Sequence, residues 1–289
     1  MLTVSHLRVA FRIGGRISVP VRDVSFSVPR GGKVALVGES GCGKSLTALA
    51  LGGLVDRAEI SGSIIGSPKI SYVFQNPVQS LDPVARTGRQ VAEAFPAGRD
   101  RRGDERRIAE LFEAVGLDGS AASKYPCELS GGQCQRVMIA MAIAAEPELL
   151  IADEPTTALD VTTQRDVLDL IEEVCARRGT AVLLITHNLG LVSRYSDFVN
   201  VMYAGEIVES GPVAEVLAHP RHPYTAGLIA AVPRLDAPKD APLCDIPGTV
   251  PPPWDWPSGC AFHPRCPHMK DSCASDAFTV CPLLGRDAT

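Results

Sequence analysis

A glycine-rich segment that ends in lysine and serine, Gly38-Glu-Ser-Gly-Cys-Gly-Lys-Ser45, has the residue types and spacing of a phosphate-binding loop. Glycines let backbone N–H groups turn inward around phosphate oxygens, and a helix starting at the loop adds partial positive charge. Lys44 supplies a point charge for the β- and γ-phosphates of a nucleotide, and the Ser45 hydroxyl suits Mg²⁺. The candidate contacts are Gly38, Glu39, Ser40, Gly41, Cys42, Gly43, Lys44, Ser45 and Leu46.

Two carboxylates follow a second apolar run, in Leu149-Leu-Ile-Ala-Asp-Glu154. In doubly wound sheets, ligands bind beyond the carboxyl ends of the strands. Asp153 is therefore placed to hold Mg²⁺ through its water shell, and Glu154 to orient or deprotonate an attacking water. An apolar run ending in two acids is a weak signal by itself, because many strands end in solvated acids.

These residues need a sheet and helices to position them. Apolar or alternating runs predict strands, and intervening stretches predict helices, so strand and helix alternate as in a parallel α/β sheet. The predicted strands are 2–9, 22–28, 33–37, 149–152 and 181–185, and the predicted helices are 44–55, 133–145 and 163–178.

Two parts of the chain depart from this pattern. Residues 84–128 are polar and helical in character, which predicts a helical insertion subdomain over about 84–147. After Val232 the chain becomes proline-rich, which forbids long helices and central strands. We therefore expect a nucleotide-binding domain over 1–232 and a loop-rich, cysteine-containing C-terminal extension over 233–289.

Composition excludes several classes of protein. The net charge of −5 and pI of about 5.7 argue against a nucleic-acid binder, which normally carries a basic patch. No run of about 18 apolar residues predicts a membrane-spanning helix. The N-terminus lacks the charged and apolar regions of a signal peptide, so we expect the protein to stay in the cytoplasm.

The pentapeptide Leu129-Ser-Gly-Gly-Gln133 distinguishes between the families that share a phosphate-binding loop. With it, the chain resembles the ABC ATPases, and the other motifs fall in that family's order. Gln75 matches the Q-loop, Ala158-Leu-Asp160 the D-loop, and His187 the switch histidine. The resemblance covers residues 1 to about 232 and implies an α/β P-loop NTPase core of the RecA-like kind.

The resemblance also implies how the site works. Two such domains pack head to tail, and each ATP lies between the Lys44 loop of one subunit and Ser130, Gly131, Gly132 and Gln133 of the other. His187 then contacts the γ-phosphate, and Gln75 links Mg²⁺ and the attacking water to the helical insertion. Phe11 stands where the family stacks an aromatic ring on adenine, although a Phe in an amphipathic strand is more often part of a core.

Four segments resemble the oligopeptide, dipeptide and nickel importer branch of the family. They are Phe74–Pro83, Tyr125–Ser130, His222–Pro233 and the cysteine group that begins at Gly259. The segment between Ser45 and Gln75 is short for this branch, which predicts a trimmed β-subdomain.

The branch implies a peripheral subunit on the cytoplasmic face of the inner membrane. Its expected partners are two polytopic permeases, a paralogous ATPase forming a heterodimer, and, indirectly, an extracytoplasmic solute-binding protein. The cargo stays open between peptides, nickel and metal–opine complexes. The alternatives are a non-transport ABC ATPase, which needs no membrane-partner surface, a DNA-repair ATPase, which carries long coiled coils, and an exporter half, which is usually fused to its membrane domain.

Four of the nine cysteines, Cys260, Cys266, Cys273 and Cys281, cluster near the C-terminus. Their spacing lacks the short C-x₂-C pairs of zinc hairpins and differs from the bacterial ferredoxin run. Spacing alone therefore leaves zinc, an iron–sulfur cluster and no metal equally open, with His263 and His268 as candidate zinc ligands. The resemblance to the importer branch, which includes members with a cluster in this extension, implies a four-iron four-sulfur (4Fe–4S) cluster.

Overall fold

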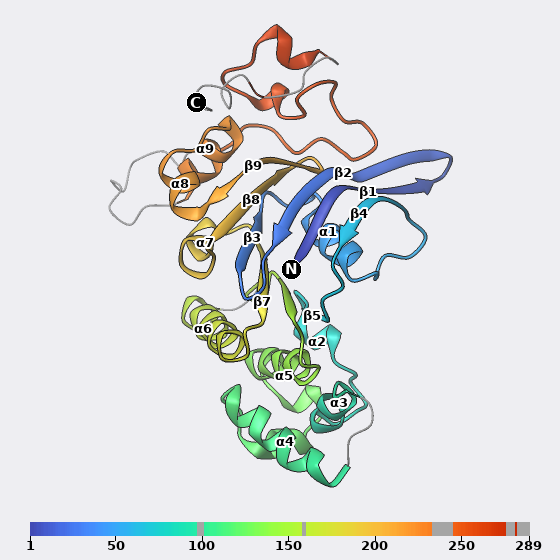
Figure 1. The fold of residues 1–289 in the computed structure, drawn as a ribbon, viewed down its shortest axis with the longest axis vertical. Helices are drawn as coiled ribbons and strands as arrows, with labels where there is room; N and C mark the ends of the chain where they lie inside the picture. Colours follow the sequence, from blue (N-terminus) through green and yellow to red (C-terminus); the bar gives the residue numbers. More distant parts are fainter. Residues whose placement is uncertain (97–100, 158–159, 233–244, 276–280, 282–289) are drawn as a thin grey trace. The chain divides into compact units, whose positions relative to one another are not determined.

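The computed structural model describes residues 1–96, 101–157, 160–232, 245–275 and 281 (Figure 1). The chain divides into two compact units. The first comprises Met1, Val28–Gly32 and Ser67–Leu184, and the second comprises Leu2–Ser27, Lys33–Gly66 and Ile185–Thr289.

The first unit combines three neighbouring strands with helices. Strands β5 and β6 are parallel, with Ile70 opposite Leu149 and Val73 opposite Ala152, and β7 lies on the other side of β6. Its elements are β5 (Ile70–Val73), α2 (Pro77–Ser80), α3 (Thr87–Glu93), α4 (Arg101–Ala114), η1 (Gly119–Ser123), η2 (Pro126–Glu128), α5 (Gly131–Ala144), β6 (Leu149–Asp153), α6 (Val161–Arg178) and the start of β7 (Ala181–Thr186).

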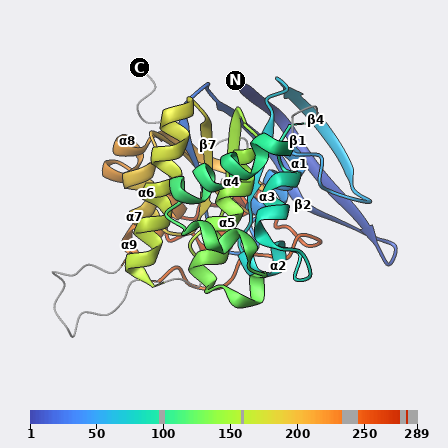
Figure 2. The ribbon, with the colours of Figure 1, turned by 90° about the horizontal axis from the view of Figure 1, so that it is seen from below.

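Helices α3, α4 and α5 contact one another in this unit, and Figure 2 shows them close together. Helix α3 is fixed to η1 by Thr87, whose buried hydroxyl donates to the Ala121 carbonyl at 2.6 Å. The polar, helical character predicted for residues 84–128 is confirmed for the described part of that segment, while residues 97–100 lie outside it.

The second unit has a mixed sheet with the strand order β4-β1-β2-β9-β8-β3. Strand β3 is parallel to β8, and β2 to β9, whereas β8 and β9, and likewise β1 and β4, are antiparallel. Its elements are β1 (Leu2–Ile13), β2 (Arg16–Val28, all but its last residue), β3 (Lys33–Val37), α1 (Lys44–Leu51), β4 (Glu59–Ile65), the end of β7, α7 (Leu189–Tyr195), β8 (Phe198–Tyr203), β9 (Glu206–Pro212), α8 (Val213–Ala218), α9 (Pro223–Ala230), η3 (His263–Arg265) and η4 (Asp271–Ala274).

The predicted α/β class is confirmed, but the sheet is mixed and not wholly parallel. Antiparallel pairing is allowed where a short turn joins consecutive strands. Strands β8 and β9 meet at Ala204 and Gly205, whose φ values of 49° and 82° are the positive pair that a tight hairpin requires. The short segment between Ser45 and Gln75 contains α1, β4 and β5.

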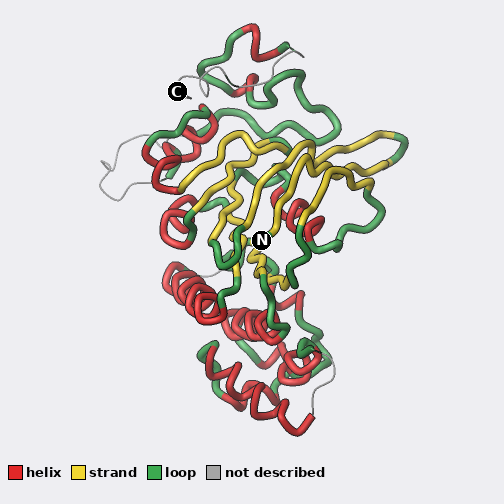
Figure 3. Tube along the Cα trace, in the orientation of Figure 1, coloured by secondary structure: helices red, strands yellow, loops and turns green. Residues whose placement is uncertain are grey.

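The described residues of the extension are mostly loop, as predicted, with the two short helices η3 and η4 (Figure 3). They nevertheless bury apolar side chains in the core of the second unit. The Phe262 ring lies edge-on to Tyr203, with centroids 5.2 Å apart, and 5.4 Å from Tyr224. Trp256 donates its indole N–H to the Val19 carbonyl of β2 at 2.9 Å. Within the described ranges, no helix is long and apolar enough to cross a bilayer.

Candidate functional site

The segment predicted to bind phosphate joins β3 to α1 in the second unit, as expected. Its geometry demands glycine at two points. A Cβ on Gly38 would lie 2.1 Å from the Met202 carbonyl oxygen, and one on Gly43 would lie 2.5 Å from that of Pro20. Gly43 also has φ of 102° and caps α1. The loop is therefore shaped by close backbone approach that no side chain allows.

Lys44 is buried within this loop. Its ammonium group donates to the carbonyl oxygens of Gly38 at 2.8 Å and Glu39 at 2.9 Å, and it lies 3.7 Å from the Cys42 sulfur. Burial raises the pKa of the Cys42 thiol. Ser45 is exposed in the first turn of α1. The lysine is thus held at the centre of the loop by oxygens of the loop itself.

The loop residues fit a nucleotide phosphate. Gly41 has φ of 84°, and no atom lies within 4 Å of where its Cβ would stand, so the backbone is open at this point. A helix N-terminus, a central ammonium group and a nearby hydroxyl are the donors that a triphosphate with Mg²⁺ requires. Ser40, Leu46 and the other predicted loop contacts belong to the same segment.

Glu154 and Gln75 meet in the first unit. Gln75 donates its amide N–H to Oε2 of Glu154 at 3.0 Å, and the Thr157 hydroxyl donates to the same oxygen at 2.9 Å. Glu154 directly follows Asp153 at the end of β6, with φ of 44°, a left-handed conformation that non-glycine residues rarely adopt. Gln75 and Glu154, two of the predicted catalytic residues, are therefore linked directly.

The signature segment forms the start of α5. The Ser130 hydroxyl accepts from the Gln133 N–H at 3.3 Å, and the Gln133 side-chain oxygen accepts from the Ser130 N–H at 3.0 Å. This reciprocal pair is a capping box, with Gly131 and Gly132 as the first two helical residues. The spacing of Ser130 and Gln133 in the sequence is that of a capping box.

Asp160 caps α6 in the first unit. Its carboxylate accepts from the backbone N–H groups of Thr162 and Thr163 and from the Thr163 hydroxyl at 2.6 Å. These hydrogen bonds, the Thr163 hydroxyl first, lower the pKa of Asp160. Ala158 and Leu159, the rest of the predicted D-loop, lie outside the described residues.

The remaining predicted residues lie in the second unit. His187 is exposed immediately after β7, and Asn188 beside it caps α7 by accepting from the Gly190 N–H at 2.9 Å. Phe11 is half-buried near the end of β1. The positions of both residues agree with their predicted places in the chain, and their roles stay predictions.

Three contacts on Glu39 were missed from the sequence. The Tyr224 hydroxyl accepts from the Glu39 N–H at 2.8 Å, and the Arg265 guanidinium donates to both carboxylate oxygens, at 2.8 and 3.0 Å. These partners are 185 and 226 residues away along the chain. No local pattern signals such a pairing, although both residues stand in segments that the sequence marks as family motifs.

The four clustered cysteines line one small cavity in the second unit, together with His222, Phe262 and other residues. The Cys260 N–H donates to the Cys273 carbonyl at 2.9 Å, and a Cβ on Gly259 would lie 2.4 Å from that oxygen. Burial raises the pKa of Cys260 and Cys266, and neighbouring thiols of the group raise both further. No group of three or more His, Cys, Asp or Glu side chains in the described ranges already has the arrangement of a metal site.

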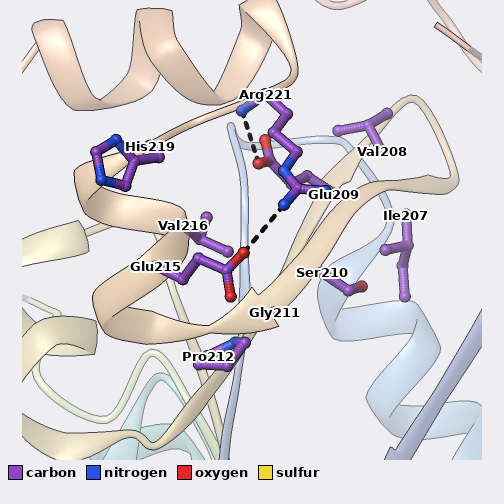
Figure 4. Close-up of a pocket in the computed structure, with 10 residues that line it drawn as sticks. All are labelled: Ile207, Val208, Glu209, Ser210, Gly211, Pro212, Glu215, Val216, His219 and Arg221. Atoms are coloured by element: carbon purple, nitrogen blue, oxygen red, sulfur yellow. Dashed lines mark hydrogen bonds and ion pairs between the residues drawn. The ribbon is translucent and has the colours of Figure 1, made fainter. Parts of the chain in front are cut away.

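A larger concavity of about 380 Å³ lies between β9, α8 and the segment before α9 (Figure 4). It contains none of the predicted site residues. Arg221 donates through its backbone N–H to Glu209 at 2.8 Å and through its guanidinium to Glu215 at 3.1 Å, as Figure 4 shows. Glu209 is thus bonded by a backbone N–H group and Glu215 by the Arg221 guanidinium, so both carboxylates already have partners within the protein.

Comparison with known families agrees with this geometry. A family model described as "ABC transporter" matches residues 21–157, and one described as "Oligopeptide/dipeptide transporter, C-terminal region" matches residues 208–273. A putative peptide import ATP-binding protein of Brucella abortus (strain 2308) is 43% identical over 296 residues, covering 94% of this chain and 89% of that protein. One from Brucella melitensis biotype 1 is 45% identical over 310 residues, covering 94% and 91%.

Solved structures show the same fold. The ATP-binding cassette MJ0796, in a dimeric post-hydrolysis state bound to ADP and Pi, superposes with a TM-score of 0.64 at 25% identity, covering 74% of this chain and 99% of that one. The cbiO1 protein of Clostridium perfringens, part of the ABC transporter complex cbiONQ, gives 0.66 at 26% identity, covering 75% and 90%. Together with the motif geometry, these matches show that the chain belongs to the ATP-hydrolysing ABC transporter ATP-binding proteins, in their oligopeptide/dipeptide branch.

Proposed function

We infer that the chain binds and hydrolyses ATP to drive the import of di- or oligopeptides. The observation that carries this proposal is the presence, in one chain, of an ABC core and of a match to the oligopeptide/dipeptide C-terminal region. Relatives over 40% identical are named peptide import ATP-binding proteins. Nickel or a metal–opine complex is the second candidate cargo, because the importer branch that the sequence resembles also carries these.

We propose the following division of roles among the predicted residues. Lys44 and the backbone of its loop bind the phosphates. Ser45 and Asp153 would hold Mg²⁺, which would supply positive charge to offset the charge on the phosphoryl group. Glu154 positions or deprotonates the attacking water, and its bond to Gln75 fixes the carboxylate. Such catalysis depends on positioning and electrostatics and needs no covalent intermediate.

Two subunits complete the site in this proposal. Residues Ser130–Gly132 of one subunit face the ATP held by the other, with His187 on the γ-phosphate and Phe11 on adenine. The dimeric structures of MJ0796 support dimerisation. A heterodimer with a paralogous ATPase is the form that the importer branch favours.

The surface after Gln75 suits a membrane partner. Val78 and Val84, which follow Gln75, are exposed apolar side chains, at 53% and 81% exposure, as is Phe74 just before it, at 38%. We place the two permease subunits on residues 76–100, of which 97–100 lie outside the described range. The chain then works as a peripheral subunit on the cytoplasmic face of the inner membrane.

The test is reconstitution of this chain with two permease subunits and a solute-binding protein of the oligopeptide/dipeptide branch. Peptide-loaded binding protein is expected to stimulate ATP hydrolysis, and crosslinks from the permeases are expected on residues 76–96. Stimulation by nickel or a metal–opine complex alone would transfer the proposal to the second cargo. Hydrolysis that ignores the permeases altogether would favour a non-transport ATPase.

The cysteine group is proposed to hold a 4Fe–4S cluster, with zinc as the competing occupant. Four thiols suit either, because both prefer thiolate ligands. The cavity volume of about 20 Å³ corresponds to one water-sized sphere.

Anaerobic purification separates the two occupants. A cluster gives brown protein with broad visible absorbance that Cys266→Ser removes. Colourless protein with one zinc per chain would reject the cluster and retain a metal that fastens the loop-rich extension. Metal-free protein with four reactive thiols would reject both.

A further inference from the structure

Glu39 is held at three separate points of its structure. Its N–H donates to the Tyr224 hydroxyl at 2.8 Å, its carboxylate binds Arg265, and its carbonyl oxygen accepts from the Lys44 ammonium at 2.9 Å. The last contact joins Glu39 to the lysine at the centre of the phosphate-binding loop. Movement of Glu39 therefore moves a direct partner of Lys44.

Arg265 is itself rigidly placed. Its side chain is only 5% exposed, and its guanidinium donates to the carbonyl oxygens of Pro247 at 2.7 Å and Ile246 at 3.0 Å. It also donates to the Tyr203 hydroxyl at 3.4 Å. These partners hold the guanidinium in one orientation. Its two terminal nitrogens then donate to the two carboxylate oxygens of Glu39.

The pairing has an electrostatic consequence for a triphosphate. Glu39 is an acid inside a loop that binds a polyanion, and its side chain is 30% exposed. An uncompensated carboxylate there would repel phosphate oxygens, since like charges in partly buried surroundings disfavour each other. Arg265 cancels that charge without occupying the loop itself.

We propose that Arg265 is a positioning residue for ATP binding, which acts through Glu39 on the Lys44 loop. The C-terminal extension then belongs to the nucleotide-binding machinery and is more than an appended tail. Arg265 lies in η3 and directly precedes Cys266, so a short turn next to one of the clustered cysteines also contacts the phosphate-binding loop.

An ion pair that merely stabilised the fold would behave differently from a positioning pair. A stabilising pair lowers the unfolding midpoint when broken but leaves ATP affinity unchanged in the molecules that remain folded. A positioning pair changes affinity while turnover at saturating ATP is largely kept. A stabilising role and a positioning role can be distinguished by following the folding of the extension separately. Both tryptophans of the chain, Trp254 and Trp256, lie in this extension. Intrinsic fluorescence therefore reports whether the extension stays folded within the second unit.

The experiment measures the Kd for ATP and kcat for purified full-length variants. Arg265→Gln is expected to raise Kd about tenfold, the size of one charge-assisted contact, with kcat within about threefold of wild type. Adding Glu39→Gln removes the exposed charge and is expected to lower the Kd of the double variant again by about threefold or more. Arg221→Gln, which breaks the ion pair with Glu215 in the same unit, is the matched control and should leave Kd within about twofold.

Wild-type ATP affinity in Arg265→Gln with native tryptophan fluorescence would overturn the proposal. So would simple addition of the Arg265 and Glu39 effects in the double variant. Should Arg265→Gln unfold, Arg265→Lys keeps the charge without the fork, and an unchanged Kd there would likewise reject it. The inference rests on the proposed role of residues 38–45. If the wild-type protein does not bind ATP, the proposed role of residues 38–45 is rejected. If Arg265→Gln binds ATP normally, only the proposed role of Arg265 is rejected.

Discussion

Substituting Glu154 by Gln separates the chemical role of its carboxylate from its structural role. Both observed donors, Gln75 Nε2 and the Thr157 hydroxyl, bond the same oxygen, Oε2, at 3.0 and 2.9 Å. A glutamine amide oxygen accepts from both at the same position. The variant therefore keeps its hydrogen bonds but loses their charge assistance, about 1 kcal/mol for each bond. The fold is expected to lose roughly 1–2 kcal/mol at most.

The expected loss of activity is larger. Removing a general base or water-positioning group typically lowers a rate 10²–10⁴-fold, which corresponds to about 3–5 kcal/mol in the barrier. Single-turnover phosphate release measures that loss, and equilibrium binding of ATP checks that affinity is retained. Turnover within about fivefold of wild type would refute the catalytic role of Glu154.

Thr157→Val is the matched control. It removes one donor to Glu154 and leaves the carboxylate charged, so turnover is expected to fall less than about tenfold. A fall as large as that of Glu154→Gln would mean that hydrogen bonding at this oxygen, and not the carboxylate itself, supports the reaction.

Three further outcomes follow from the site. Lys44→Ala is expected to raise the Kd for ATP by at least about tenfold, because a ground-state phosphate contact is lost. An unchanged Kd with a reduced kcat would mean that Lys44 acts in catalysis and not in ATP binding. Gly43→Ala is expected to lower the free energy of unfolding in urea by about 3 kcal/mol or more, because the new Cβ would clash with the Pro20 carbonyl oxygen. Gly41→Ala has a strained φ but no clash, so it is expected to lower the same free energy by only about 1–2 kcal/mol. Ser130→Gly keeps most of the capping stability, so a large loss of ATP hydrolysis there would show that the hydroxyl contacts nucleotide.

The phosphate-binding loop could be predicted because its requirements are local. Close turns require glycine, and the ammonium and hydroxyl groups must follow at a fixed spacing. Neighbouring residues in the sequence are therefore enough to predict phosphate binding. The same holds for Asp153 and Glu154, which follow directly from the end of a buried strand. The structure adds at Glu154 a positive φ that no pattern of residue types announces.

Strands β4, β5, β8 and β9 were not predicted from the sequence, for different reasons. Strand β4 is exposed at every residue, so it lacks the alternation that betrays a half-buried strand. Strand β5 has only four residues and gives too short a signal. Strands β8 and β9 carried a usable signal, since an apolar run is followed by a glycine-containing turn and a second run.

Contacts that join distant parts of the chain could not be predicted from either part alone. Arg265 stands within the segment that the sequence marked for its cysteines, and Glu39 within the segment marked for its glycines and lysine. Either residue taken singly is an unremarkable charged side chain. Their pairing follows only once β8, α9 and the extension gather Tyr203, Tyr224 and Phe262 into one aromatic cluster, with ring centroids 4.6–5.4 Å apart.

That cluster explains why an extension of loops can act on a loop at the nucleotide site. Loops are usually poor at transmitting position, because exposed backbone moves easily. Here Phe262 is almost fully buried, and the carbonyl groups of Ile246 and Pro247 fix the guanidinium of Arg265 from the far side. Rigidity comes from aromatic packing and buried hydrogen bonds, not from helices or strands. Arg265, which bonds Glu39, directly precedes Cys266, so if Arg265 acts as proposed, substitutions at Cys266 are expected to change the affinity for ATP.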